Sequence, residues 1–135
     1  MATFLFKTEP STYSYARLVG DKHAVWDGVS NPVALKYLRT VSKGDTVMIY
    51  HTGDEKQVVG LATATSDAYP DPKLDNPKVV VVDLKPDRKL KTPVTLAQVK
   101  ADAVLKGNDL ARLPRLSVIP FSEAQFKRLL ELANE

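Results

Sequence analysis

Three short segments of the chain carry side chains that could do chemistry. The first, Lys7-Thr8-Glu9-Pro10, puts a cation, a hydroxyl and a carboxylate at the point where an apolar run ends. Polar groups at the end of a strand are well placed to face the mouth of a pocket. They could also form a charge pair that only finishes the strand. The residues alone therefore leave a binding role and a structural role open for Lys7, Thr8 and Glu9.

The second segment, Trp26-Asp27-Gly28-Val29-Ser30-Asn31, holds the only tryptophan of the chain. We predict that it is a loop leading into a helix. The indole of Trp26 could belong to the core. Alternatively, it could be a platform on which a flat ligand stacks, with Asn31 and nearby backbone groups hydrogen-bonding to the edge of that ligand.

Three further candidates are aromatic or imidazole side chains. Tyr69 lies in the third segment, Tyr69-Pro70-Asp71, where its ring could contact a ligand or pin a proline-rich loop to the fold. His51 directly follows an apolar strand, so it could face solvent in a hairpin or hydrogen-bond to a ligand at the rim of a pocket. Tyr15 lies in a short helix after the first strand. We include Tyr15, His51 and Tyr69 among the candidate ligand-binding residues.

Several classes of chemistry are excluded by what the sequence lacks. There is no cysteine, which excludes disulfides, thiolate metal sites and cysteine nucleophiles. The Gly-x-Ser-x-Gly motif of serine hydrolases and the glycine-rich phosphate-binding fingerprints are absent as well. Two histidines could supply only part of a metal shell. We expect no cofactor and no metal.

The elements that must position these residues are short. Apolar runs bounded by turn residues predict five strands, at residues 3–8, 46–50, 57–64, 78–84 and 115–119. Helix starts are indicated at Ser11 or Thr12, at Asn31 before Pro32, at Thr95 and at Ser122. Gly60 inside a strand predicts a bulge or a barrel corner. The pattern predicts an α+β fold, a small mixed β-barrel with peripheral short helices, formed by one domain over residues 1–135.

The excess of positive charge lies in the second half of the chain. Nineteen basic and sixteen acidic residues give a net charge of +3, and residues 1–67 hold seven of each sign. A net charge of this size does not by itself indicate a nucleic-acid-binding protein. The basic stretch at 85–91 could be a solvated loop rich in lysine, or part of a stripe that holds phosphates without reading sequence. The candidate phosphate contacts are Lys85, Arg88, Lys89, Arg112 and Arg115.

Membrane and export signals are also lacking. The first residues hold no basic segment followed by a long apolar run, and no stretch approaches about 18 apolar residues. We expect a cytoplasmic protein without a membrane partner, and a monomer.

Taken together and in order, the motifs resemble one family. The chain first resembles the start of an EVE domain, in Phe4-Leu5-Phe6-Lys7-Thr8-Glu9-Pro10, Tyr13-Ser14-Tyr15, Trp26-Asp27-Gly28-Val29 and Asn31. The match continues in Tyr50-His51-Thr52, Val58-Val59-Gly60, Tyr69-Pro70-Asp71, Val82-Asp83, Pro93-Val94-Thr95-Leu96 and Arg115-Leu116-Ser117-Val118. The resemblance is to EVE domains of the thymocyte nuclear protein type and covers nearly the whole chain.

The resemblance implies a PUA-like fold, related to YTH, ASCH and PUA domains. It also implies a non-catalytic module that recognises a modified base, notably a modified cytosine, in DNA or RNA. The implied pocket lies between the strand end at residues 7–9 and the Trp26 loop. There Trp26 would stack on a flipped-out base, and Thr8, Glu9 and Asn31 would hydrogen-bond to its edge. Lys7 and the basic second half would hold the backbone.

Two features of the resemblance bear on the ligand and on catalysis. EVE domains commonly have arginine before the asparagine, where this chain has Ser30, a difference that would weaken a phosphate contact or shift the preferred base. Related ASCH proteins include small hydrolases of acylated cytidine that use lysine, threonine and glutamate, and Lys7, Thr8 and Glu9 supply these residue types. Because side chains alternate along a strand, the three cannot easily converge. We therefore favour the reader of modified bases over an ASCH-like hydrolase of modified nucleosides.

Overall fold

The computed structural model describes residues 1–135, which form a seven-stranded mixed sheet with five short helices around it. The strands are β1 (Thr3–Thr8), β2 (Ala24–Trp26), β3 (Thr46–His51), β4 (Gln57–Ala64), β5 (Tyr69–Pro70), β6 (Val80–Thr95) and β7 (Val118–Phe121). The helices are α1 (Tyr15–Asp21), α2 (Pro32–Leu38), α3 (Leu96–Ala101), α4 (Asp109–Arg112) and α5 (Glu123–Leu132). The α+β class that the sequence predicts is confirmed.

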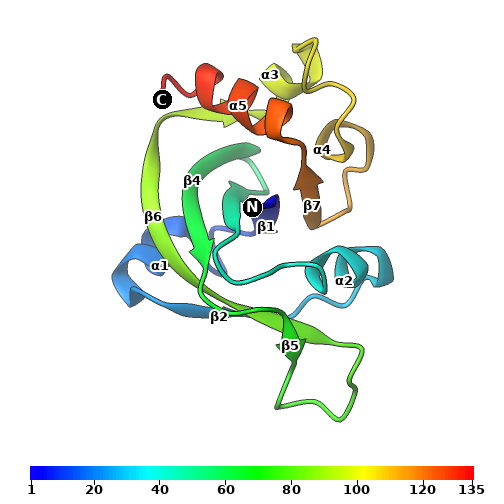
Figure 1. Ribbon diagram of the computed structural model, residues 1–135. Helices are drawn as coiled ribbons and strands as arrows, with labels where there is room; N and C mark the ends of the chain where they lie inside the picture. Colours follow the sequence, from blue (N-terminus) through cyan, green and yellow to red (C-terminus); the bar gives the residue numbers. More distant parts are fainter.

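The sheet curls into a half-barrel. Its strand order is β2-β6-β4-β3-β1-β7, with β5 paired to β6 off this path. Figure 1 shows β6 sweeping round the outside of the curl, with α1 beside it and α5 across one end. One cluster of 34 buried residues fills the interior. The strands β1 and β3 run parallel, in a register that aligns Thr8 with His51, so their polar ends lie side by side.

The strand β6 is much longer than the sequence predicts. We expected a strand over 78–84 and then a lysine-rich loop or stripe, but the chain stays extended along β4 as far as Thr95. Pro86 and Pro93 argue against a strand because proline cannot donate to a ladder. The register between β4 and β6 shifts on both sides of Gly60, and these irregularities accommodate the prolines. The basic residues between positions 85 and 91 therefore lie on a strand and not in a loop.

Gly60 lies at the bulge that its position in β4 predicts, and the structure supplies the reason for a glycine. A Cβ at Gly60 would overlap the ring of Tyr15. The hydroxyl of Tyr15 donates to the Leu61 carbonyl at 2.7 Å. The first residue of α1 therefore packs directly on the backbone of β4.

Three of the predicted helix starts are confirmed. Asn31 caps α2, because its Oδ1 accepts from the amides of Val33 and Ala34 at 2.9 and 3.1 Å. Thr95 opens α3 and Ser122 opens α5, each with a complete capping box. Side-chain acceptors at these positions satisfy amides that have no partner inside the helix.

The helix α1 begins later than predicted. Ser14 caps it, since the Ser14 hydroxyl accepts from the Arg17 amide at 3.1 Å. Ser11 is not available for that role, because its amide and its hydroxyl both donate to the carboxylate of Glu9. The amide of Thr12 likewise donates to the Glu9 carbonyl in a turn. The prediction of a cap at Ser11 or Thr12 is therefore wrong.

The sequence does not predict β2, β5 or α4, which contain three, two and four residues. Trp26 is the last residue of β2, opposite Val82 of β6, and does not lie in a loop as predicted. The strand β7 begins at Val118 and not at Arg115. Such short elements carry too few residues for a periodic pattern, and their pairing partners define them.

None of the helices has the length and apolar character needed to span a membrane.

Candidate functional site

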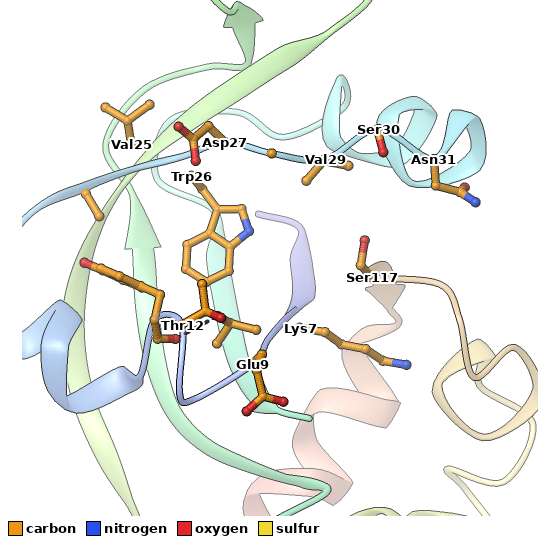
Figure 2. A pocket seen from close by; sticks show the side chains of 14 residues that line it. Lys7, Glu9, Thr12, Val25, Trp26, Asp27, Val29, Ser30, Asn31 and Ser117 are labelled. Carbon is orange, nitrogen blue, oxygen red and sulfur yellow. Dashed lines mark hydrogen bonds between the residues drawn. The ribbon is translucent and has the colours of Figure 1, made fainter. Parts of the chain in front are cut away.

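A cavity of about 650 Å³ opens between the end of β1 and the segment that runs from β2 to α2. Figure 2 shows Trp26 at its centre, with the carboxylate of Glu9 on one side of the indole and that of Asp27 on the other. We call it the tryptophan cavity. Its size is typical of small-molecule sites. Among its fourteen lining residues are five of the eight predicted ligand-binding residues, Lys7, Thr8, Glu9, Trp26 and Asn31.

Trp26 is both a core residue and part of the cavity wall. Only 8% of it is exposed. Its ring packs on Phe6 with 5.6 Å between the centroids and stands edge-on to Tyr13 at 6.2 Å. The indole N–H donates to no protein atom, and it is not among the fully buried polar atoms that lack a partner, so it is open to the cavity. Trp26 is thus a core tryptophan whose free edge and N–H are accessible to a ligand.

The carboxylate of Glu9 is held by its neighbours. Its Oε1 accepts from the amide and hydroxyl of Ser11 at 3.2 and 3.1 Å, and its Oε2 accepts from the hydroxyl of Thr52 at 3.3 Å. These donors, the Ser11 amide first, lower the pKa of Glu9. The side chain is therefore ionised at neutral pH and can only accept hydrogen bonds. It forms no ion pair with Lys7, contrary to the charge-pair alternative for the strand end.

Lys7 and Thr8 direct their polar atoms to different partners. The Nζ of Lys7 donates to the Pro114 carbonyl at 2.9 Å and lies 5.5 Å from the centroid of the Tyr50 ring. Burial lowers the pKa of Lys7. The Oγ1 of Thr8 donates to the Tyr13 carbonyl at 2.7 Å. The polar residues of the strand end therefore line one cavity but do not hydrogen-bond to one another.

Asn31 stands at the rim of the tryptophan cavity, and the helix cap already uses part of its side chain. Its Oδ1 accepts from the amides of Val33 and Ala34. The Nδ2 group remains, so Asn31 can donate to a ligand but has little capacity to accept. The groups it suits are a carbonyl oxygen, a ring nitrogen or a phosphate oxygen.

The cavity wall also includes residues that the sequence does not identify as site residues. The carboxylate of Asp27 is exposed in the cavity. It forms no hydrogen bond and no ion pair with another residue of the protein. Its position directly after Trp26 was the signal that could have identified it. Ser117 also lines the cavity, and its carbonyl accepts from the Lys7 amide at 3.0 Å. Only the folded sheet brings Ser117 next to β1, so no local pattern could have found it.

Tyr15 and His51 are not brought together with Trp26. They line a second cavity of about 560 Å³, which we call the Tyr15 cavity, together with Arg88 and other residues of β6. His51 is buried, its Nε2 accepts from the Tyr15 amide at 3.0 Å, and its Nδ1 lies 2.9 Å from Glu55 Oε1. Because Nε2 accepts the hydrogen bond from the Tyr15 amide, the ring proton lies on Nδ1, which donates to Glu55. Burial raises the pKa of Tyr15 to about 12.

Tyr69 lines neither of these cavities. Its hydroxyl donates to Asp83 Oδ1 at 2.6 Å, which joins β5 to β6. This hydrogen bond, with burial and the charge of Asp83, raises the pKa of Tyr69 to about 12. Tyr69 therefore holds its segment against β6. This is the structural role that the sequence left open beside a ligand contact.

The predicted phosphate contacts do not form one continuous stripe. Lys85, Arg88 and Lys89 lie on β6, whereas Arg112 ends α4 and Arg115 follows it. Arg88 is already paired, with its Nε 2.8 Å from Glu135 Oε1 and its Nη1 3.6 Å from Asp87. The hydrogen bond to Glu135 raises the pKa of Arg88. Arg115 forms no ion pair and lines a smaller groove that also includes Asn31.

The tryptophan cavity suits a flat polar ligand better than a metal. No group of three or more histidine, aspartate or glutamate side chains in the chain is close enough to hold a metal ion. The cavity instead combines an indole edge, an amide, hydroxyls and carboxylates on a partly apolar wall. A few convergent polar groups on an apolar surface are typical of small-molecule and base-binding sites.

Comparisons with known proteins point to one family. The family model of the EVE domain matches residues 2–132. Thymocyte nuclear protein 1 of Danio rerio and of Homo sapiens are each 31% identical to the chain over 133 residues, covering 82% of the chain and 58% and 59% of their own lengths. The chain therefore spans less than two thirds of these curated relatives.

Solved structures share the fold. The NMR structure of a Rhodopseudomonas palustris protein has a TM-score of 0.94 and 38% identity, covering 99% of this chain and 94% of that one. The human THYN1 protein in complex with DNA containing 5-methylcytosine has a TM-score of 0.91 and 28% identity, covering 100% and 99%. The PUA-like architecture that the resemblance implied is thereby confirmed. Since the family model matches almost its whole length, the chain belongs to the EVE domain family.

Proposed function

We propose that this chain binds nucleic acid and holds a modified base, first of all a methylated cytosine of DNA, in the tryptophan cavity. The observation that carries the proposal is the free edge of Trp26, a buried indole with an unpartnered N–H between two carboxylates. The human relative solved with 5-methylcytosine DNA supports the same ligand class. A flipped base loses a few kcal/mol of stacking and pairing, and stacking on an aromatic side chain returns about 1–3 kcal/mol.

The polar groups around Trp26 complement the edge of a cytosine. That edge presents an amino group as donor and a carbonyl and ring nitrogen as acceptors. We assign the amino group to Asp27, whose carboxylate has no partner in the protein, because Glu9 already accepts three hydrogen bonds. The Nδ2 of Asn31 and the indole N–H supply donors for the acceptors of the base. The family resemblance implies that Glu9 hydrogen-bonds to the base edge, whereas we assign the amino group of that edge to Asp27.

A methyl group on the base would be accommodated by the apolar part of the wall. Ala24, Val25 and Val29 line the cavity beside Trp26. Burying one methyl or methylene group contributes about 0.8 kcal/mol, which corresponds to roughly fourfold in affinity. We therefore expect a preference for methylated over plain cytosine of several-fold.

The hydrolase alternative has weaker support. Lys7, Thr8 and Glu9 line the cavity, but their polar atoms bond to three different parts of the chain. A nucleophile activated by a base requires a hydrogen bond between the two, and none joins these side chains. A binding role, which the family relatives also favour, uses the same groups without that requirement.

The proposal is tested with duplexes that differ at one central position, carrying cytosine, 5-methylcytosine or 5-hydroxymethylcytosine, at fixed salt. Single-stranded DNA and RNA of the same sequence complete the set. We expect the 5-methylcytosine duplex to bind several-fold more tightly than the plain one. Asp27→Asn should remove most of the preference for the 5-methylcytosine duplex over a duplex with thymine at that position, and Glu9→Gln should retain most of it.

Asp75→Asn is the matched control, because Asp75 is exposed and lies outside the cavity. It should bind all probes as the wild type does. Equal affinity of the wild type for all three duplexes would contradict the reader. Turnover of acylated cytidine that disappears in Glu9→Gln would establish the hydrolase instead.

A further inference from the structure

A smaller groove adjoins the tryptophan cavity. It measures about 320 Å³ and is lined by Asn31, Val33, Leu113, Pro114, Arg115 and Leu116. We call it the Arg115 groove. It shares a residue, Asn31, with the tryptophan cavity, whereas the Tyr15 cavity shares none.

We propose that the Arg115 groove holds the nucleotide next to the one in the tryptophan cavity, with its base on Val33 and Leu113 and its phosphate on Arg115. This inference rests on the proposed function. Nucleotides follow one another every few ångströms along a strand, about 3.4 Å in B-DNA. A strand whose base occupies the tryptophan cavity must therefore place a neighbouring nucleotide against an adjoining surface.

The chemistry of the groove matches a nucleotide. Val33 and Leu113 are 47% and 46% exposed, and both border the groove. Arg115 is exposed and belongs to none of the ion pairs of the chain. Apolar side chains can cover a base or sugar, and a free guanidinium binds phosphate with two parallel hydrogen bonds.

Lys7 fixes the position of the groove relative to the cavity. Its Nζ donates to the Pro114 carbonyl at 2.9 Å, and its amide donates to the Ser117 carbonyl at 3.0 Å. Figure 2 shows the Lys7 side chain extending away from Trp26, on the side of the cavity where Ser117 lies. The loop that carries Leu113 and Arg115 is thus tied to β1, the strand whose end forms the cavity.

This path differs from the one that the charge distribution suggested. Arg88 and Lys89 line the Tyr15 cavity, which shares no residue with the tryptophan cavity. Arg88 is also paired with Glu135 at 2.8 Å. A strand that leaves the tryptophan cavity through the Arg115 groove does not meet these two cations.

The first test measures the affinity of Leu113→Ser and Arg115→Gln for a duplex with one 5-methylcytosine, over a range of salt concentrations. Leu113→Ser should weaken binding roughly three- to tenfold, as expected for losing contact with about half of a leucine side chain. Arg115→Gln should reduce the slope of log affinity against log salt by about 1. Lys43→Gln, which removes an exposed cation just before β3 that lines none of these cavities, is the control and should change neither quantity. Thermal melting checks that each variant folds.

The second test locates the neighbouring nucleotide. Duplexes with an abasic site on the 5′ or the 3′ side of the 5-methylcytosine remove the base that would contact Leu113. The effect of Leu113→Ser should disappear with one of these two probes. The free nucleoside 5-methyl-2′-deoxycytidine, which occupies only the tryptophan cavity, should bind both variants as it binds the wild type.

The outcomes separate the two proposals. If Leu113→Ser and Arg115→Gln bind the duplex as the wild type does while the preference for 5-methylcytosine persists, the groove assignment is wrong and the proposed function stands. If the wild type shows no preference among the duplexes, the proposed function fails and the groove assignment fails with it. Persistence of the Leu113→Ser effect with both abasic probes would also contradict contact with a neighbouring base.

Discussion

The amide of Tyr15 donates to Nε2 of His51 at 3.0 Å, which ties the first residue of α1 to the last residue of β3. The other ring nitrogen of His51 lies 2.9 Å from Glu55. This contact fixes the segment between β1 and α1, which contributes Thr12 and Tyr13 to the tryptophan cavity. A buried histidine outside the cavity therefore helps to shape it.

His51→Leu should destabilise the protein by about 1–3 kcal/mol, because it leaves the buried amide of Tyr15 without an acceptor. Urea denaturation measures this difference. His23→Leu is the control, since His23 is exposed and should change stability by less than about 0.5 kcal/mol. Equal stability of the two variants would show that the imidazole does not support α1.

Two glycine-to-alanine substitutions should change stability in opposite directions. Gly60→Ala should destabilise by about 1–3 kcal/mol, because the new Cβ overlaps the Tyr15 ring in a packed core. Gly20→Ala should stabilise by about 0.5–1 kcal/mol, since Gly20 lies within α1 with free space around it. Thermal or urea unfolding of both variants checks the pair. A neutral Gly60→Ala would mean that Tyr15 does not pack on β4 as described.

Substitutions of Trp26 should separate its structural role from its binding role. Trp26→Ala should destabilise by about 3–5 kcal/mol, because most of the side chain is buried against Phe6. Trp26→Phe keeps an aromatic ring in the core and should remain folded under the binding conditions. It loses the indole N–H, and binding of the 5-methylcytosine duplex should weaken about two- to tenfold. Wild-type affinity in a folded Trp26→Phe variant would show that the indole N–H does not contact the bound base.

The hydrogen bond between Tyr69 and Asp83 should make part of the stability depend on alkaline pH. The native pKa of Tyr69, about 12, lies above its ordinary value of 10, so the native state holds this proton more tightly than the unfolded state. The contribution to stability is complete below pH 10 and is lost as pH rises from 10 to 12. The difference in unfolding free energy between wild type and Tyr69→Phe should therefore be constant below pH 10 and shrink above it. A difference that does not change up to pH 12 would contradict the assignment.

The sequence predicts those elements whose signals are local. The cap at Asn31 before Pro32 and the capping boxes at Thr95 and Ser122 all lie where expected. The strand β6 was underestimated because prolines interrupt its pattern, and only pairing with the bulged β4 keeps it extended. The strand β2 could not be predicted from three residues, so Trp26 was placed in a loop.

The candidate site also divides into residues that the sequence places correctly and residues whose position depends on the pairing of the sheet. Lys7, Glu9 and Trp26 meet at one cavity, as the family resemblance implied, although three strands separate β1 from β2 in the sheet. The curl of the sheet brings the ends of β1 and β2 to the same cavity. Tyr15 and His51 belong to motifs of the same family resemblance, but they contact each other at the Tyr15 cavity, which shares no residue with the tryptophan cavity. Sequence proximity does not reveal which side of a strand or helix a residue occupies until the pairing of the sheet is known.

The fluorescence of Trp26, the single tryptophan of the chain, tests the central claim most directly, because its indole lines the proposed base-binding cavity. The duplex with 5-methylcytosine is titrated into the protein while Trp26 emission and the anisotropy of a labelled duplex are followed together. A base in the tryptophan cavity should change the emission with the same midpoint as the anisotropy, and the plain cytosine duplex should require several-fold higher concentrations. Saturating anisotropy with unchanged Trp26 emission would show that the duplex binds elsewhere and would contradict the account.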